Sequence, residues 1–152
     1  GSFSVSGGDL WVGSTGMNRI GRIAETFPAD QFSEMVVSSA KALDTRVQVF
    51  VRHGAVERYG FHYDPSISGW GIKRDGGSGA PTLGSVAGPG PVGGDIIRVE
   101  ARGTPIIGLL NGVELLRVTD SVLLSGVPGM TFVPISAPLP TPVVSEWRGG
   151  GL

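Results

Sequence analysis

Residues 95–120 read D-I-I-R-V-E-A-R-G-T-P-I-I-G-L-L-N-G-V-E-L-L-R-V-T-D. In the first part of this stretch, apolar and charged side chains alternate with a period of two, which is typical of a β-strand with one buried face. The alternating residues are Ile97, Val99 and Ala101 on one face and Arg98, Glu100 and Arg102 on the other. Gly103-Thr104-Pro105 interrupts the alternation, so the strand is predicted to end there.

The dipeptide Asn111-Gly112 separates two apolar runs, residues 106–110 and residues 113–119. Asn-Gly at such a place indicates a two-residue hairpin, because a type I′ turn needs positive φ at both central residues. The two runs are therefore predicted to pair antiparallel. Together with the preceding strand they form a three-stranded meander whose register is fixed by its turns.

Further alternating segments with turn residues between them occur along the whole chain. They predict strands at 3–5, 10–12, 19–26, 31–39, 46–53, 58–63, 70–74, 82–86, 126–132 and 143–147, with the proline-rich residues 134–142 extended. For Gln31 to Ser39, a helix from Asp30 to Leu43 with Asp30 as N-cap is the competing interpretation, and Val36-Val37 favours the strand. About a dozen short strands predict an all-β fold, a sandwich of two antiparallel sheets in a jelly roll.

Glycine and proline are abundant, at 26 and 11 of the 152 residues. The glycines lie between alternating apolar segments, where turns require them, so the composition indicates many tight turns and not disorder. The length predicts one domain. We expect a single jelly roll over residues 1–148 and a flexible glycine-rich tail at residues 149–152.

Charge and composition argue against several classes of function. The formal net charge is -1 and charged residues make up 16%, so nucleic-acid binding is not expected. No apolar run approaches the roughly 20 residues that span a bilayer, so no membrane insertion is expected. The N-terminus lacks the pattern of a secretory signal. Cysteine is absent, which excludes disulfides and thiolate chemistry, and no cofactor is predicted.

The central part of the chain resembles the concanavalin A-like (laminin G-like, lectin/glucanase) jelly roll. The resemblance covers roughly residues 30–132 and rests on the segments D-Q-F-S-E-M-V-V, V-Q-V-F-V-R-H, Y-G-F-H-Y, G-W-G-I-K-R-D-G, G-D-I-I-R-V-E-A-R-G, I-I-G-L-L-N-G-V-E-L-L-R-V-T-D and G-V-P-G-M. The residues at the positions of the family pattern are Asp95, Arg98, Glu100, Gly103, Asn111, Gly112, Asp120, Gly126 and Gly129. This pattern is more specific for fold than for function.

Within that superfamily, the sequence resembles modules of bacteriophage minor tail proteins and other virion-surface proteins. The resemblance implies a non-catalytic, lectin-like binding or decoration module on the virion surface, in the tail or on the capsid, or otherwise extracellular. The implied partners are a host cell-surface glycan and other virion subunits, with the chain oligomeric in the assembled particle. The alternatives are a purely structural virion protein without glycan binding and a polysaccharide-acting glycosidase.

The sequence departs from the catalytic members of this superfamily, which carry an E-x-D-x-x-E run on one strand. Retaining glycosidases need two carboxyl groups about 5–5.5 Å apart. This chain has no such run, and its closest acid-bearing strands carry one glutamate each, Glu34 and Glu100. We therefore predict no catalytic residues and no enzymatic activity.

Sugars are held by aromatic rings that stack on the pyranose and by polar groups that bond its hydroxyls. The densest set of such residues comes from three successive predicted strands. The candidate carbohydrate-binding residues are Arg52, His53, Tyr59, His62, Trp70 and Arg74. If the strands pair, one sheet face would gather Arg52, His62 and Arg74. The alternative interpretation, which we prefer, places Tyr59, Phe61, Tyr63 and Trp70 in the core and the arginines on a solvated face.

No metal site is predicted. His53 and His62 have no third ligand placed beside them, so structural histidines are the preferred interpretation. Asp64, Asp75 and Asp120 lie in or beside loops without the D-x-D-x-D pattern of a calcium loop, and turn capping accounts for them.

Overall fold

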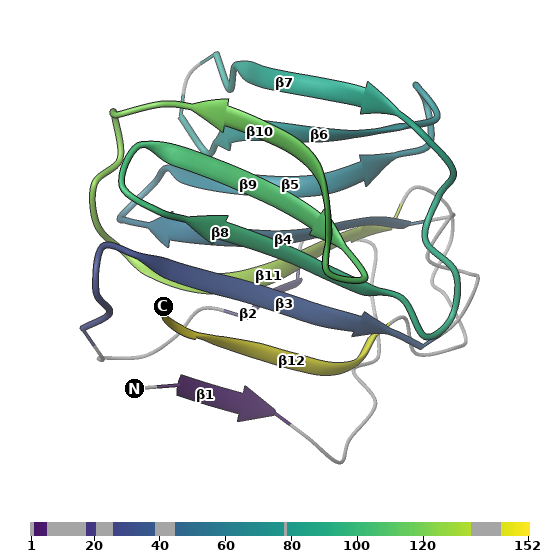
Figure 1. Ribbon diagram of the computed structural model, residues 1–152, viewed down its shortest axis with the longest axis horizontal. Helices are drawn as coiled ribbons and strands as arrows, with labels where there is room; N and C mark the ends of the chain where they lie inside the picture. The colour runs from purple at the N-terminus through teal and green to yellow at the C-terminus, as the bar shows by residue number, and fades with distance from the viewer. Residues whose placement is uncertain (1, 6–17, 21–25, 39–44, 78, 135–143) are drawn as a thin grey trace.

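The computed structural model describes residues 2–5, 18–20, 26–38, 45–77, 79–134 and 144–152. Within these ranges it contains twelve strands and no helix. The strands form two six-stranded antiparallel sheets that pack face to face (Figure 1). The predicted all-β jelly-roll sandwich is confirmed.

Sheet A has the strand order β1-β12-β3-β8-β9-β10. Its strands are β1 (Ser2–Val5), β12 (Val144–Gly151), β3 (Gln31–Val37), β8 (Ile96–Ala101), β9 (Pro105–Leu110) and β10 (Val113–Thr119). Sheet B has the order β2-β11-β4-β5-β6-β7. Its strands are β2 (Asn18–Ile20), β11 (Val127–Pro134), β4 (Thr45–His53), β5 (Arg58–Asp64), β6 (Gly69–Asp75) and β7 (Thr82–Ala87). The chain passes from one sheet to the other after β1, β2, β3, β7, β10 and β11, so each sheet contains one uninterrupted meander, β8–β10 or β4–β7.

The meander β8–β10 forms as its sequence predicts. Asn111 and Gly112 have φ of 52° and 79°, the positive values that a type I′ turn requires. The Asn111 side chain fixes the turn further, because its Oδ1 accepts the Ile96 N–H at 2.8 Å and its Nδ2 donates to Asp95 Oδ1 at 2.8 Å. The turn is thereby tied to the start of β8.

Residues 31–37 form a strand, which confirms the preference for a strand over a helix. This strand, β3, pairs with β12 on one side and β8 on the other. Its alternation places Met35 and Ser33 toward sheet B with no exposed surface. Ser33 Oγ donates to Gly129 O of β11 at 2.6 Å and accepts Trp147 Nε1–H at 2.9 Å, so a polar contact joins the sheets inside the core.

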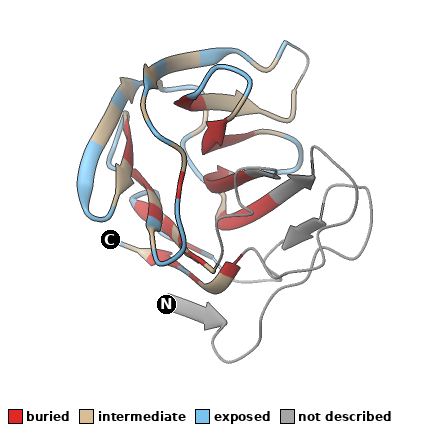
Figure 2. Cartoon of the chain, turned by 90° about the vertical axis from the view of Figure 1, so that its right-hand side faces the viewer, coloured by how far each residue is buried: buried red, intermediate tan, exposed pale blue. Residues whose placement is uncertain are grey.

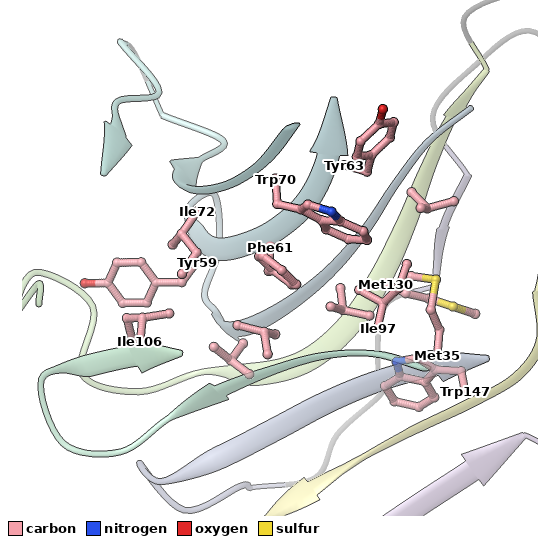
Figure 3. Packing of buried hydrophobic residues seen from close by; sticks show 14 of the residues in the cluster. Met35, Tyr59, Phe61, Tyr63, Trp70, Ile72, Ile97, Ile106, Met130 and Trp147 are labelled. Atoms are coloured by element: carbon pink, nitrogen blue, oxygen red, sulfur yellow. The ribbon is translucent and has the colours of Figure 1, made fainter. Parts of the chain in front are cut away.

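The core lies between the two sheets, and Figure 2 shows in red the buried residues along their strands. It is filled by inward residues from every second position of the strands, and Figure 3 shows their packing. The largest of those with less than 2% exposure are Trp70, Trp147, Tyr59, Phe61 and Met35. Complete burial of a side chain of this kind contributes about 1.5–3 kcal/mol.

The prediction of a flexible tail at residues 149–152 is wrong for its three glycines, which lie in a strand. Gly149, Gly150 and Gly151 continue β12 and pair with β3. A Cβ at Gly149 would lie 2.7 Å from the Trp147 ring, and one at Gly151 would lie 2.4 Å from Pro28 Cγ. The glycines are needed for close packing, and β12 extends beyond the predicted strand at 143–147.

The strand predicted at residues 3–5 is present as β1. Residues 2–5 pair with β12, at the edge of sheet A. Residues 10–12 lie outside the described residues, as do 21–25 of the strand predicted at 19–26 and most of the extended segment predicted at 134–142.

Candidate functional site

The three strands that carry the sequence-predicted site, β4, β5 and β6, are neighbours in sheet B. They do not bring the six residues together on one face. Tyr59 and Trp70 point into the core and are 0% and 1% exposed. Trp70 stacks on Phe61 at 5.2 Å between ring centroids, and its Nε1 donates to Pro89 O at 3.0 Å. The interpretation of these aromatic residues as core is confirmed.

Arg74 lies on the inner side of sheet B, because the register of β5 and β6 places it opposite Tyr59. Both side chains bind Asp120 after β10: the Tyr59 hydroxyl donates to Oδ1, and Arg74 Nη1 donates to Oδ2 at 3.2 Å. Burial and the hydrogen bond with Asp120 raise the pKa of Tyr59 to about 12. Burial alone would raise the pKa of Asp120, but the bonds from Tyr59 and Val122 and the charge of Arg74 lower it.

Arg52 does not lie on the predicted face either. Its φ is 53°, which breaks the alternation at the end of β4, and its side chain is 1% exposed. The guanidinium donates to three backbone carbonyls: Ala29 from Nε at 3.0 Å, Leu123 from Nη1 at 3.0 Å and Gly103 from Nη2 at 2.7 Å. The expected gathering of Arg52, His62 and Arg74 on one sheet face is therefore wrong, and Arg52 joins loops at one end of the sandwich.

The outward face of β4–β7 carries a different set of polar side chains, which we call the polar face. Register pairs place Gln48 beside His62 and Gly60 beside Lys73. The members of the polar face are Gln48, Arg58, His62, Lys73, Asp75, Thr82 and Ser85. Of the sequence-predicted residues, only His62 belongs to it. His53 lies nearby at the end of β4, with its ring edge-on to Phe50 at 5.2 Å.

Two glycines flatten the polar face. The Gln48 side chain lies over Gly60, where a Cβ would come within 2.0 Å of Gln48 Nε2. His62 lies beside Gly71, where a Cβ would be 3.4 Å from His62 Cε1. A Cβ at position 60 would displace the Gln48 side chain, so Gly60 is required by the packing of this face, whereas a Cβ at position 71 would make an ordinary van der Waals contact with His62.

Arg58 is the most deeply buried cation of the polar face, at 2% exposure, and it contacts several of its neighbours there. Its Nη2 donates to Asp75 Oδ2 at 2.6 Å, its Nε reaches Gln48 Oε1 at 3.4 Å, and its guanidinium lies 5.3 Å from the centroid of the Phe50 ring. Nη1 has no hydrogen-bond acceptor among the described residues. Thr131 Oγ1, on β11 beside Gln48, likewise has none there.

The accessible part of the polar face lies on β6 and β7. Gln48 and His62 are buried, whereas Asp75 is 31% exposed, Lys73 is half-buried, and Thr82 and Ser85 are exposed. Sequence reasoning missed these four residues, although the signal was present. In G-W-G-I-K-R-D, placing Trp70, Ile72 and Arg74 on the core side assigns Gly71, Lys73 and Asp75 to the outward side.

The outward face of sheet A is a closed array of ion pairs. Arg98 bonds Glu34 at 2.8 Å and Glu100 at 2.7 Å, and Arg102 bonds Glu100 at 2.7 Å. Burial alone would raise the pKa of Glu100, but the hydrogen bonds from Arg102 and Arg98 lower it. A general acid of a glycosidase needs a raised pKa. Glu100 is therefore held as an ionised carboxylate, paired with both arginines.

Two further observations bear on function. In the part of the chain that the structure describes, no three histidine, aspartate or glutamate residues are grouped to hold a metal ion. Within the same part, no helix is long and apolar enough to cross a membrane.

The fold has solved counterparts at low sequence identity. The carbohydrate-binding module CBM66 from Bacillus subtilis superposes with a TM-score of 0.61 at 15% identity, over 99% of this chain and 92% of that one. The galectin LEC-6 from Caenorhabditis elegans gives 0.58 at 11% identity, over 88% and 95%. The CBM2 module of the evolved Dit protein from Lactobacillus casei BL23 phage J-1 gives 0.54 at 16% identity, over 88% and 66%.

Glycoside hydrolases also share this sandwich. No protein-family profile matches the chain, and neither does a curated protein sequence. The structural likenesses show that the chain has the concanavalin A-like jelly-roll fold, and binding modules and enzymes both use this fold.

Proposed function

We propose that this chain is a non-catalytic glycan-binding module that uses the polar face of sheet B. The observation that carries the proposal is the grouping of donors and acceptors on the accessible part of that face. An ammonium group, a carboxylate and two hydroxyls come from two adjacent strands, on a floor flattened by glycine. Saccharide hydroxyls are recognised by such groups. Carbohydrate-binding modules and a galectin among the structures with this fold support the proposal.

Asp75 has the central role in this proposal. Arg58 binds its Oδ2 at 2.6 Å, which fixes the carboxylate and leaves Oδ1 to accept a sugar hydroxyl. Lys73, two residues earlier on the same face, donates to a neighbouring oxygen. The hydroxyls of Thr82 and Ser85 extend the surface on β7. The buried residues Gln48 and His62 serve as support and do not contact the sugar.

Binding at such a shallow surface would be weak at each site. The tryptophans and tyrosines whose side chains the structure describes, Tyr59, Tyr63, Trp70 and Trp147, are all buried, so these rings do not stack on a sugar. Many copies on one particle would compensate through avidity. We therefore place the module on a phage virion, in the tail or on the capsid, where it contacts host-surface glycan. The sequence resemblance and the fold of the phage J-1 Dit module support this placement.

A glycan array probed with a multivalent form of the protein tests the proposal. Binding to at least one glycan should be lost in Asp75→Asn and weakened in Ser85→Ala. Arg117→Gln, a change on the outer side of β10 where Arg117 pairs with Glu114, is the control and should bind like the wild type. No binding to any glycan, or binding that Asp75→Asn leaves intact, would overturn the proposal. Release of reducing ends from a bound polysaccharide would contradict the non-catalytic assignment.

A second candidate function is a purely structural virion protein that contacts other subunits. Exposed apolar side chains at one end of the sandwich favour it. Val56, Val122 and Leu124 are 55%, 56% and 62% exposed, on the loops after β4 and β10. Ordered assembly on the particle without a glycan signal, lost in Val122→Ser with Leu124→Ser, would support this candidate.

A further inference from the structure

Lys73 carries a charge that no carboxylate of the described residues balances. The acidic residues at this end of sheet B each have another partner. Arg58 pairs with Asp75 at 2.6 Å, and Arg74 pairs with Asp120 at 3.2 Å and with Glu57 at 3.9 Å. At the other end of β5, Asp64 accepts hydrogen bonds from Ser66 at 3.0 Å and 2.6 Å.

Arg58 places a second positive charge on the same side of the sheet. A guanidinium has five N–H groups. Nε and Nη2 of Arg58 are engaged with Gln48 and Asp75, and Nη1 has no acceptor among the described residues although the side chain is buried. Arg58 and Lys73 border the same glycine, because Gly60 lies two residues after Arg58 on β5 and opposite Lys73 on β6. Two cations thus flank Gly60, and the Gln48 side chain lies over this glycine.

From this juxtaposition we infer that the ligand of the polar face carries an anionic substituent, a carboxylate or a phosphate, seated against Lys73 on the Arg58 side. The inference rests on the proposed glycan-binding function and adds the class of glycan. Asp75 does not oppose such a group, because Arg58 neutralises it. Charge-assisted hydrogen bonds are roughly twice as strong as neutral ones, so an acidic sugar binds here in preference to its neutral counterpart.

Matched pairs of glycans test the inference. Oligogalacturonides and their methyl esters differ only in the carboxylate, and phosphorylated oligomannosides and their dephosphorylated forms differ only in the phosphate. We expect the wild type to prefer the charged member of at least one pair, and the pair that responds identifies the source of the anion. Lys73→Gln should reduce that preference about fivefold, the upper range for an exposed ion pair, and raised salt should reduce it similarly.

Arg117→Gln removes one positive charge elsewhere and should keep the preference, which separates a local effect from net charge. Lys73 is half-buried at the accessible side of the sheet, so Lys73→Gln should fold, and its thermal midpoint checks this. Equal binding to both members of every pair, or a preference that Lys73→Gln leaves intact, would overturn the inference while leaving the proposed function standing. Absence of binding to any glycan, charged or neutral, would remove the proposed function and the inference together.

Discussion

Nη2 of Arg52 donates a 2.7 Å hydrogen bond to the carbonyl oxygen of Gly103, and this contact joins sheet B to the β8–β9 turn of sheet A. The same guanidinium also binds the carbonyls of Ala29 and Leu123, so one buried side chain connects three separate loops. Gln31 completes the arrangement, because its Oε1 accepts the Arg52 backbone N–H at 2.9 Å.

Replacing Arg52 should therefore lower the free energy of unfolding more than an ordinary surface substitution does. We expect Arg52→Lys to lower the free energy of unfolding by about 3 kcal/mol, since an ammonium group cannot reach three carbonyls and buried carbonyls lose their donors. Urea denaturation measures the change. Arg117→Lys should stay within about 0.5 kcal/mol of the wild type. Similar midpoints for the two variants would show that Arg52 does not hold this end together.

The Tyr59 hydroxyl predicts a dependence of stability on alkaline pH. Its pKa is raised from 10.0 to about 12, so the folded state favours the protonated phenol. This contribution is complete below pH 10 and is lost as the pH rises toward 12. Each pH unit between the two pKa values corresponds to about 1.4 kcal/mol. The difference in unfolding free energy between the wild type and Tyr59→Phe should therefore shrink across that window. A Tyr59→Phe difference that stays constant across this pH window would contradict the account.

The glycines of β12 should not tolerate a methyl group. Gly149→Ala would place a Cβ 2.7 Å from the Trp147 ring and 3.0 Å from Pro128, and we expect a loss of about 1–3 kcal/mol from overpacking. Gly54→Ala is the matched control, because a Cβ there meets nothing within 4 Å. Thermal melts of the two variants should separate clearly. If Gly149→Ala melts with Gly54→Ala, the close packing of this strand is not required.

A negative charge at position 111 should destabilise the fold. In Asn111→Asp the donor to Asp95 Oδ1 is replaced by a second carboxylate, which we expect to destabilise the fold by about 1 kcal/mol, less at high salt. Asn111→Gly keeps the freedom for a φ of 52° without adding charge and should lose less. Chemical denaturation at low and high salt distinguishes the two. A loss for Asn111→Asp that does not respond to salt would mean that repulsion by Asp95 is not its cause.

The local parts of the fold could be predicted from the sequence. Asn111-Gly112 encodes its own turn, and the alternation in β3–β6 and β8 encodes extended structure with two distinct sides. The end of β12 could not be predicted, because a run of glycines has the composition of a linker. Only its long-range pairing with β3 and its contact with Pro28 identify it as a strand.

The candidate site shows the same limit. Alternation identifies which residues of a strand share a side, but it does not say which side faces the core. The prediction that Arg74 shares a face with His62 assumed a register of β5 and β6 in which the two residues point the same way. The observed register places Arg74 opposite the buried Tyr59, so Arg74 points inward. The position of the Arg52 side chain could not be predicted for another reason. Its positive φ depends on contacts with loops far away in the sequence.

The closed ion-pair array on sheet A has a consequence for crowding. Arg98 and Arg102 are matched by Glu34 and Glu100 within 2.8 Å, and Arg148 by Glu146 at 2.6 Å. Opposite charges this close cancel well inside the Debye length of about 8 Å at physiological ionic strength. This surface therefore has almost no net electric field. Neighbouring molecules can pack with these faces together at high density without electrostatic repulsion.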